Sequence, residues 1–178
     1  MQFPTVISPL EAFLRQPDIE ASPAWELIDS HPQQKPMPTL FHSRLQRNLV
    51  NAINQQTTSY EAIQELRCVV PPLSPVPDIA IVEITRLPEE DGPFQGAPDW
   101  LIEIRSPDQS TLLLQKKILH CMANGTQVAW LIDIQRQLIW VWQGQELPTI
   151  YAENEVLPAL GNLTIFTVSG VTAMTQQR

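Results

Sequence analysis

Two carboxylates lie inside apolar, strand-like stretches of this chain. Asp78 belongs to PVPDIAIV at residues 75–82, and Glu103 belongs to DWLIEIRSP at residues 99–107. An ionised carboxylate in such a stretch is costly to bury unless a cation pairs with it. If the two stretches are neighbouring strands, the carboxylates repel each other unless a divalent cation lies between them. The pattern predicts an all-oxygen site for Mg²⁺ or Mn²⁺, with Asp78 and Glu103 as its ligands.

Arg105 is a further candidate for this site, because residues two apart in a strand project from the same face. Glu103 and Arg105 are therefore expected to point into one cavity. A purely structural interpretation of the same residues is also open. In that interpretation Asp78 caps a strand, and Glu103 forms an ion pair with Arg105 that is worth little if exposed.

Three other titratable residues have several interpretations. Lys116 and Lys117 occupy an amphipathic helical segment, where lysines commonly form a solvated face. His42 lies near the start of another helical segment. It could cap that helix, bond a backbone carbonyl, or act as a ligand near Glu26.

The elements that must position these residues follow from caps and apolar spacing. Helices are expected after the caps Ser8 and Thr39, and from Leu112 to Met122 after Asp108 or Ser110. Segment 31–38 is expected to be irregular because of its prolines, and 84–98 to be a surface loop. Strands are expected at 24–29, 60–70, 79–82, 100–105, 128–134 and 138–142, with short ones near 149–150 and 163–166 before a closing helix. This order predicts an α/β or α+β fold with a mixed sheet.

Length and composition indicate one packed globular domain spanning residues 1–178, with 43% hydrophobic residues. The apolar runs are shorter than the roughly 20 residues of a membrane-spanning helix, and the N-terminal residues do not resemble a signal peptide. We therefore expect a cytoplasmic protein without a membrane partner. Cys68 and Cys121 lack metal-binding spacing and are expected to be reduced, buried thiols. The net charge of −8 repels nucleic acid, so such a partner requires a local basic patch or bound cations.

A series of sequence motifs, given below in chain order, resembles the Uma-two family of endonucleases. This family is frequent in cyanobacteria and has a fold similar to PD-(D/E)XK restriction endonucleases. The resemblance covers most of the chain. It is carried by WELID at 25–29, KPMPTLFHSRLQ at 35–46, VPDIAIV at 76–82, PDWLIEIRSPDQS at 98–110 and ILHCMANGTQVAWLID at 118–133.

The resemblance implies a restriction-endonuclease-like mixed sheet flanked by helices, and Mg²⁺- or Mn²⁺-dependent hydrolysis of DNA. It places the two acids of the nuclease motif on Asp78 and Glu103. The motif's lysine position holds Arg105, which can contact a phosphate but cannot accept a proton. Many relatives take a basic residue from the following helix, where Lys117 matches and Lys116 is adjacent. Lys117 is accordingly expected to act on the water.

Glu26 matches a further acid of the family and is expected to bind metal or to orient a basic group. Ser30 replaces the glycine that follows in the family pattern. A homodimer is expected by analogy with nucleases that cut two strands with two subunits. Two other functions stay open: a non-catalytic protein that uses the nuclease fold for protein interaction or dimerisation, and a metal-dependent phosphodiesterase for small nucleotides.

Overall fold

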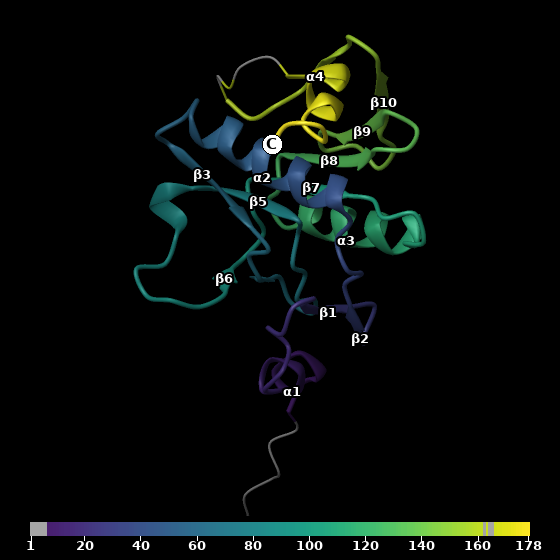
Figure 1. Ribbon diagram of the computed structural model, residues 1–178. Coiled ribbons are helices and arrows are strands. Elements are labelled where there is room, and N and C mark those ends of the chain that lie inside the picture. The colour runs from purple at the N-terminus through teal and green to yellow at the C-terminus, as the bar shows by residue number, and fades with distance from the viewer. Residues whose placement is uncertain (1–6, 162, 164–165) are drawn as a thin grey trace, which may run out of the picture.

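A six-stranded mixed sheet lies at the centre of the molecule (Figure 1), with the strand order β10-β9-β8-β7-β5-β3. The computed structural model describes residues 7–161, 163 and 166–178. The elements in chain order are α1 (Pro9–Leu14), β1 (Trp25–Ile28), β2 (His31–Gln34), α2 (Leu40–Asn54), β3 (Tyr60–Gln64), β4 (Cys68–Val69), β5 (Ile79–Glu83), the 3₁₀ turn η1 (Ile84–Arg86), β6 (Phe94–Gln95), β7 (Trp100–Ile104), α3 (Thr111–Ala123), β8 (Val128–Asp133), β9 (Leu138–Trp142), β10 (Thr149–Ala152), β11 (Val156–Leu157), β12 (Phe166–Thr167) and α4 (Val168–Ala173).

The centre of the sheet is the parallel pair β7 and β8, joined through α3. Parallel strands need such a crossover, whereas the antiparallel pair β8 and β9 needs only the short turn at 134–137. The antiparallel strand β5 lies on the other side of β7. The expected mixed sheet and the central position of the strand containing Glu103 are therefore confirmed.

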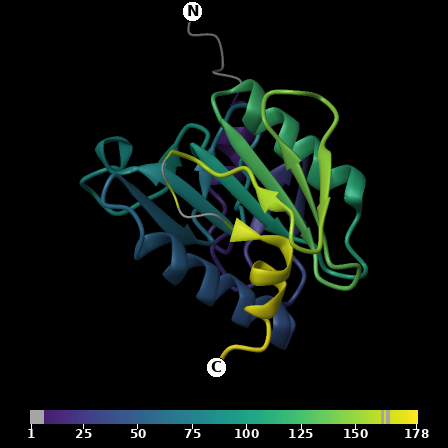
Figure 2. The same ribbon diagram turned by 90° about the horizontal axis from the view of Figure 1, so that it is seen from above.

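Helices cover both faces of the sheet, as the view from above shows (Figure 2). Helices α2 and α4 pack on one face with alternate residues such as Ile79 and Ile102. Helix α3 packs on the other face with Ala80 and Leu101. This alternation explains why both central strands are apolar apart from Glu103 and Asp133, since each face lies under a helix.

The N-terminal part of the chain, α1 with the hairpin of β1 and β2, projects from one end of the sheet (Figure 1). The prediction that segment 31–38 is irregular was wrong for its first half, because β2 pairs with β1 in antiparallel register. A proline is tolerated in such a two-stranded ribbon, where its missing N–H can face outward. Asp29 and Ser30 both have positive φ, 56° and 65°, as a tight hairpin turn requires. The turn therefore forms with Ser30 at the position where the family pattern has glycine.

Two further expectations need correction. The strand expected at 60–70 is divided into β3 and β4, because Glu65 has a φ of 52° that ends the extended ladder. The loop expected at 84–98 contains η1 and the short strand β6, which pairs with β4. The strand expected at 163–166 lies partly outside the described residues. Its last residue begins β12.

The remaining predictions about elements hold. Ser8 caps α1 in a capping box, and Thr39 and Ser110 accept the first-turn N–H groups of α2 and α3. Cys68 and Cys121 are buried free thiols. No helix within the described ranges is long and apolar enough to cross a membrane.

Candidate active site

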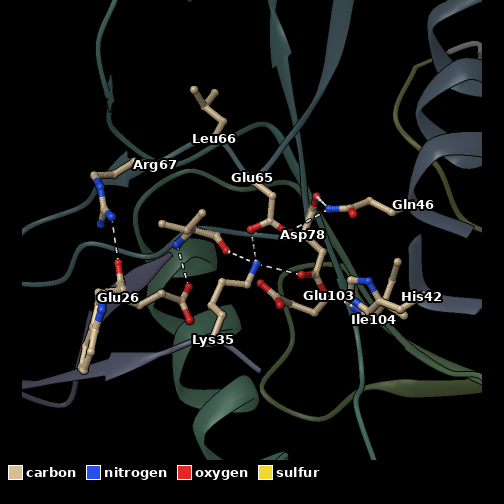
Figure 3. Close-up of polar contacts among 12 residues, drawn as sticks. Glu26, Lys35, His42, Gln46, Glu65, Leu66, Arg67, Asp78, Glu103 and Ile104 are labelled. Atoms are coloured by element: carbon tan, nitrogen blue, oxygen red, sulfur yellow. Dashed lines mark hydrogen bonds and ion pairs between the residues drawn. The ribbon is translucent and has the colours of Figure 1, made fainter. Parts of the chain in front are cut away.

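Asp78 immediately precedes β5 and lies beside Lys35 (Figure 3), with both of its carboxylate oxygens engaged. Its Oδ1 accepts a hydrogen bond from Lys35 Nζ at 2.7 Å. Its Oδ2 accepts the backbone N–H of Ile104 at 2.7 Å and lies 3.3 Å from His42 Nε2. The bond to Ile104 crosses from β5 to β7, so it places Asp78 beside the strand that carries Glu103. The side chain is 5% exposed, and this position needs the cations that surround it.

Glu103 lies on the α3 side of β7 and contacts Lys117, as the family resemblance implied. Lys117 Nζ lies 2.7 Å from Glu103 Oε1 and 2.7 Å from Glu26 Oε1. Glu26 Oε1 also accepts the backbone N–H of Val76 at 2.6 Å, so Glu26 joins β1 to the segment that precedes Asp78. The structure thus brings together Asp78, Glu103, Lys117 and Glu26. Whether they bind metal or catalyse stays a prediction.

Lys117 is buried because it lies on the apolar stripe of α3. Leu114, Lys117, Ile118 and Cys121 recur at three- and four-residue spacing and are all buried. The solvated-face interpretation is therefore wrong for Lys117, which is 2% exposed. It is correct for Lys116, which is 44% exposed and pairs with the exposed Asp29 at 2.8 Å. Lys116 points away from the cluster and does not substitute for Lys117.

Lys35 is a member of the site that the sequence prediction missed. Its ammonium lies 2.7 Å from Asp78 Oδ1, 2.7 Å from Glu65 Oε2 and 2.8 Å from the carbonyl oxygen of Val76. Figure 3 shows this ammonium between the Glu65 and Asp78 carboxylates. A single lysine between polar and proline residues after β2 gives no periodic signal of burial. Only its position within the motif KPMP marks it in the sequence.

Helix α2 contributes His42 and Gln46, which lie one turn apart on the same face. Gln46 Nε2 donates to Glu65 Oε1 at 3.0 Å and to the carbonyl oxygen of Asp78 at 2.6 Å. His42 Nδ1 is buried and has no hydrogen-bond partner within the described part of the chain. None of the interpretations offered for His42 is confirmed: its side chain lies 3.3 Å from Asp78 rather than near Glu26, and its role as a ligand stays a prediction.

The pKa shifts in this cluster follow from burial and charge. Burial would raise the pKa of Asp78, but Lys35 and His42 outweigh it and hold the pKa below its ordinary range. Burial raises the pKa of Glu103 above its ordinary range, and Asp78 adds to this rise against the opposing effect of Lys117. Asp78 is therefore firmly ionised, whereas ionising Glu103 is costly.

Both buried lysines remain protonated. Burial would lower the pKa of Lys117, but Glu103 and Glu26 outweigh it and raise the pKa above its ordinary value. The pKa of Lys35 is raised in the same way, chiefly by Asp78 against the effect of burial. Lys117 can accordingly orient a water or stabilise negative charge, but it is not a proton acceptor in this environment.

The donor set fits a divalent cation in chemistry and charge. The carboxylates of Glu26, Glu65, Asp78 and Glu103 face the ammonium groups of Lys35 and Lys117 and, at Asp78, the imidazole of His42, so full ionisation leaves an excess of negative charge. The buried Glu103 Oε1 accepts no aligned hydrogen bond from the described residues. No group of three or more His, Cys, Asp or Glu side chains in those residues is arranged to hold a metal ion. A cation here would therefore have only two carboxylates, Asp78 and Glu103, as side-chain ligands. Mg²⁺ commonly needs only one or two carboxylates, because waters and substrate phosphates complete its shell.

Two cavities reach the cluster, and Lys35 lines both of them. One, of about 220 Å³, is lined by Asp78, Glu65 and His42. The other, of about 420 Å³, is lined by Glu26 and Lys117. Lys35 and Ser106 line both cavities, so solvent or a ligand can approach either side of the acids.

Arg105 does not share a cavity with Glu103, contrary to expectation. It lies beyond β7, where the parallel register places it beside the end of β8, and its Nη1 lies 3.1 Å from Asp133 Oδ2. Asp133 also pairs with Arg136 at 3.0 Å. The structural interpretation of a pair between Glu103 and Arg105 is wrong for the same reason, since Lys117 is the partner of Glu103.

Replacing Arg105 by lysine therefore tests a structural position. We expect any activity of the protein to change less than about twofold, and the free energy of unfolding to fall by at most about 1 kcal/mol, because the pair with Asp133 is partly exposed. Urea unfolding together with an activity assay measures both quantities. A large gain or loss of activity in a variant of unchanged stability would instead place Arg105 in the catalytic machinery.

Comparison with known proteins identifies the family. A family model described as Uma2, putative restriction endonuclease, matches residues 10–173 of this chain. The chain belongs to this family. Among solved structures, a putative nuclease of DUF820 from Anabaena variabilis ATCC 29413 matches with a TM-score of 0.86 and 36% sequence identity, covering 93% of this chain and 98% of that chain. No curated protein matches.

Membership of the Uma2 family confirms the resemblance seen in the motifs, and the match to the Anabaena structure confirms the nuclease-like mixed fold. The matched range includes every residue of the acid and lysine cluster, from Glu26 to Lys117. A nuclease role is consistent with the descriptions of both the family and the neighbour.

Proposed function

We propose that this protein is a divalent-cation-dependent endonuclease that hydrolyses phosphodiester bonds of DNA. The observation that carries the proposal is the buried cluster in which Asp78 and Glu103, on adjacent strands, each contact a lysine ammonium. Family membership supports nucleic acid as the substrate class. DNA itself, the cation and a homodimer that cuts both strands are parts of the proposal.

Asp78 and Glu103 are the residues that would hold Mg²⁺ or Mn²⁺. A bound cation supplies polarisation of a phosphoryl oxygen and lowers the pKa of a bound water. It also attracts phosphate locally, which offsets the repulsion of DNA by a chain of net charge −8.

The chain's own residues then have distinct roles. Lys117 stays protonated and stabilises the negative charge that builds up on the phosphoryl oxygens in the transition state. His42 lines the cavity beside Asp78, and its Nδ1 has no hydrogen-bond partner among the described residues. His42 is thus the group that accepts the proton of the attacking water, while the phosphodiester bond to the leaving oxygen breaks. Glu26 holds Lys117 in position.

Cleavage of supercoiled plasmid and of single- and double-stranded oligonucleotides, with Mg²⁺, with Mn²⁺ and with EDTA, tests the proposal. We expect cleavage only with a cation, and a loss of at least about a hundredfold in Glu103→Gln. The free energy of unfolding of Glu103→Gln should stay within about 1 kcal/mol of the unaltered chain at pH 8. The reason is that the substitution removes a carboxylate whose raised pKa makes ionisation costly, which offsets the lost contact with Lys117.

Equal cleavage by the unaltered chain and Glu103→Gln would contradict the proposed site. Cleavage of small cyclic or linear dinucleotides without cleavage of DNA would instead identify a phosphodiesterase. Failure to cleave any of these substrates would favour a non-catalytic protein that retains the nuclease fold.

A further inference from the structure

The ammonium of Lys35 occupies a cage of three oxygens. These are Asp78 Oδ1 and Glu65 Oε2, each at 2.7 Å, and the carbonyl oxygen of Val76 at 2.8 Å. A lysine ammonium has three N–H donors, so these three acceptors account for all of them. In this arrangement Lys35 has no donor left for a phosphate. It acts as a resident cation that neutralises Asp78 and Glu65.

The cage also has the ligand chemistry of a divalent cation site. Two carboxylate oxygens and one backbone carbonyl oxygen are hard donors of the kind that Mg²⁺ and Mn²⁺ bind. Gln46 Nε2 donates to the other oxygen of Glu65, Oε1, at 3.0 Å, which fixes the carboxylate with Oε2 turned toward the cage. Two of the three cage oxygens, from Glu65 and Val76, thus come from outside the pair Asp78 and Glu103 and are already in place.

The cage is accessible from solvent. The Glu65 side chain is 42% exposed, and the cavity of about 220 Å³ is lined by Lys35, Glu65 and Asp78 together. Lys35 also lines the second cavity, of about 420 Å³. A cation can thus enter through the first cavity, and the second cavity offers space into which the long lysine side chain can rotate.

We propose that a divalent cation exchanges with the Lys35 ammonium in this cage, so that Glu65, Asp78 and the Val76 carbonyl oxygen form a second cation position beside the one proposed for Asp78 and Glu103. The exchange relieves the excess of carboxylates over ammonium groups in the cluster. It also releases a protonated amine next to the cavity. The inference rests on the proposed function only in that Asp78 serves both positions.

Mn²⁺ binding tests the exchange without any nucleic acid. It is measured by calorimetry and by the loss of the electron paramagnetic resonance signal of free Mn²⁺. In Lys35→Met the competing ammonium is gone, and we expect the cage to bind Mn²⁺ at least about tenfold more tightly than in the unaltered chain. Lys116→Met is the matched control, because it removes the same charge from an exposed pair away from the site. Adding Glu65→Gln to Lys35→Met should abolish the gain.

Equal Mn²⁺ binding by Lys35→Met and Lys116→Met would overturn the inference, and so would a gain that survives Glu65→Gln. If Lys35→Met does not fold, the unaltered chain still provides a test, since the sequence contains only three lysines, Lys35, Lys116 and Lys117. In protein labelled with ¹³C and ¹⁵N at lysine, saturating Mg²⁺ should shift the side-chain resonances of Lys35 and leave those of Lys116 unchanged.

The lysine resonances also separate this inference from the proposed function. A shift of Lys117 without a shift of Lys35 would overturn the exchange, and the proposed function would then be judged by the cleavage assay with Glu103→Gln alone. A shift of Lys35 in a protein that cleaves no substrate would retain the exchange and contradict the proposed function.

Discussion

Substitution of Lys117 by methionine is expected to lower the free energy of unfolding by about 3–5 kcal/mol, because removal of one partner leaves buried charge without compensation. The methionine side chain fills a similar volume on the apolar stripe of α3, so lost packing contributes little. Glu26 and Glu103, whose side chains are 9% and 1% exposed, would then face each other without the ammonium that lies 2.7 Å from both.

The loss of unfolding free energy in Lys117→Met should depend on pH. The pKa of Glu103 is already raised in the folded protein, so the stability that this group contributes is present at low pH and is lost as pH rises through its folded pKa. Without Lys117, which lowers that pKa, the folded state favours the protonated carboxyl still more. Lys117→Met should therefore be more destabilised at pH 9 than at pH 6.

Urea unfolding at both pH values measures this effect. Lys116→Met provides the control, since it removes an adjacent but exposed lysine and should change the free energy of unfolding by less than about 1 kcal/mol. The double variant Lys117→Met with Glu103→Gln should recover part of the loss. Unfolding of Lys117→Met at the same urea concentration as Lys116→Met would show that the buried cluster does not contribute to stability as inferred.

Substitution of Asp78 by asparagine is expected to reduce cleavage by about a hundred- to a thousandfold and to weaken Mn²⁺ binding at the same time. Asparagine can still accept the backbone N–H of Ile104, but it lacks the charge that pairs with Lys35 and that would hold the cation. Because the pKa of Asp78 is depressed, the stability it contributes is present above its unfolded pKa and is lost as pH falls toward the folded value.

The chain offers a closely matched control in another Pro-Asp pair, Pro98-Asp99. Asp99 is buried, accepts the backbone N–H of Glu83 at 2.7 Å and pairs with Arg86 at 2.6 Å, but it does not contact the cluster. Asp99→Asn should lose stability while its folded fraction cleaves DNA within about twofold of the unaltered rate. Cleavage by Asp78→Asn at the rate of Asp99→Asn would remove Asp78 from the mechanism.

The two acids of the candidate site were identifiable in the sequence because Asp78 immediately precedes an apolar strand and Glu103 interrupts one. Asp78 and Glu103 stand out as charges where both faces of a strand should be buried, and that signal needs no knowledge of long-range contacts. The motif order added Glu26 and Lys117, and the structure places the Lys117 ammonium 2.7 Å from both Glu26 Oε1 and Glu103 Oε1. The sheet and the caps of α1, α2 and α3 were likewise accessible from local patterns.

The error over Arg105 has a geometric cause. Strand periodicity assigns a residue to a face, but the partner of a long side chain depends on which residues the neighbouring strand presents there. Beyond the end of β7 that neighbour is Asp133 of β8. The parallel register that decides this pairing depends on the crossover through α3, so the local sequence around Arg105 does not determine it.

By itself, the sequence determined the mixed α and β fold and the family motifs and marked the two acids as candidates, because helix caps, apolar periodicity and charges beside or within apolar strands are local properties. Only the tertiary structure decided which basic side chains lie beside these acids. Lys35 lies 43 residues before Asp78, in a segment whose prolines predict no regular structure, and becomes buried only because the hairpin of β1 and β2 packs against the end of the sheet. A lysine on a helix or in a loop has the same local pattern whether it is solvated or paired. The folded contacts alone distinguish the buried Lys35 and Lys117 from the exposed Lys116.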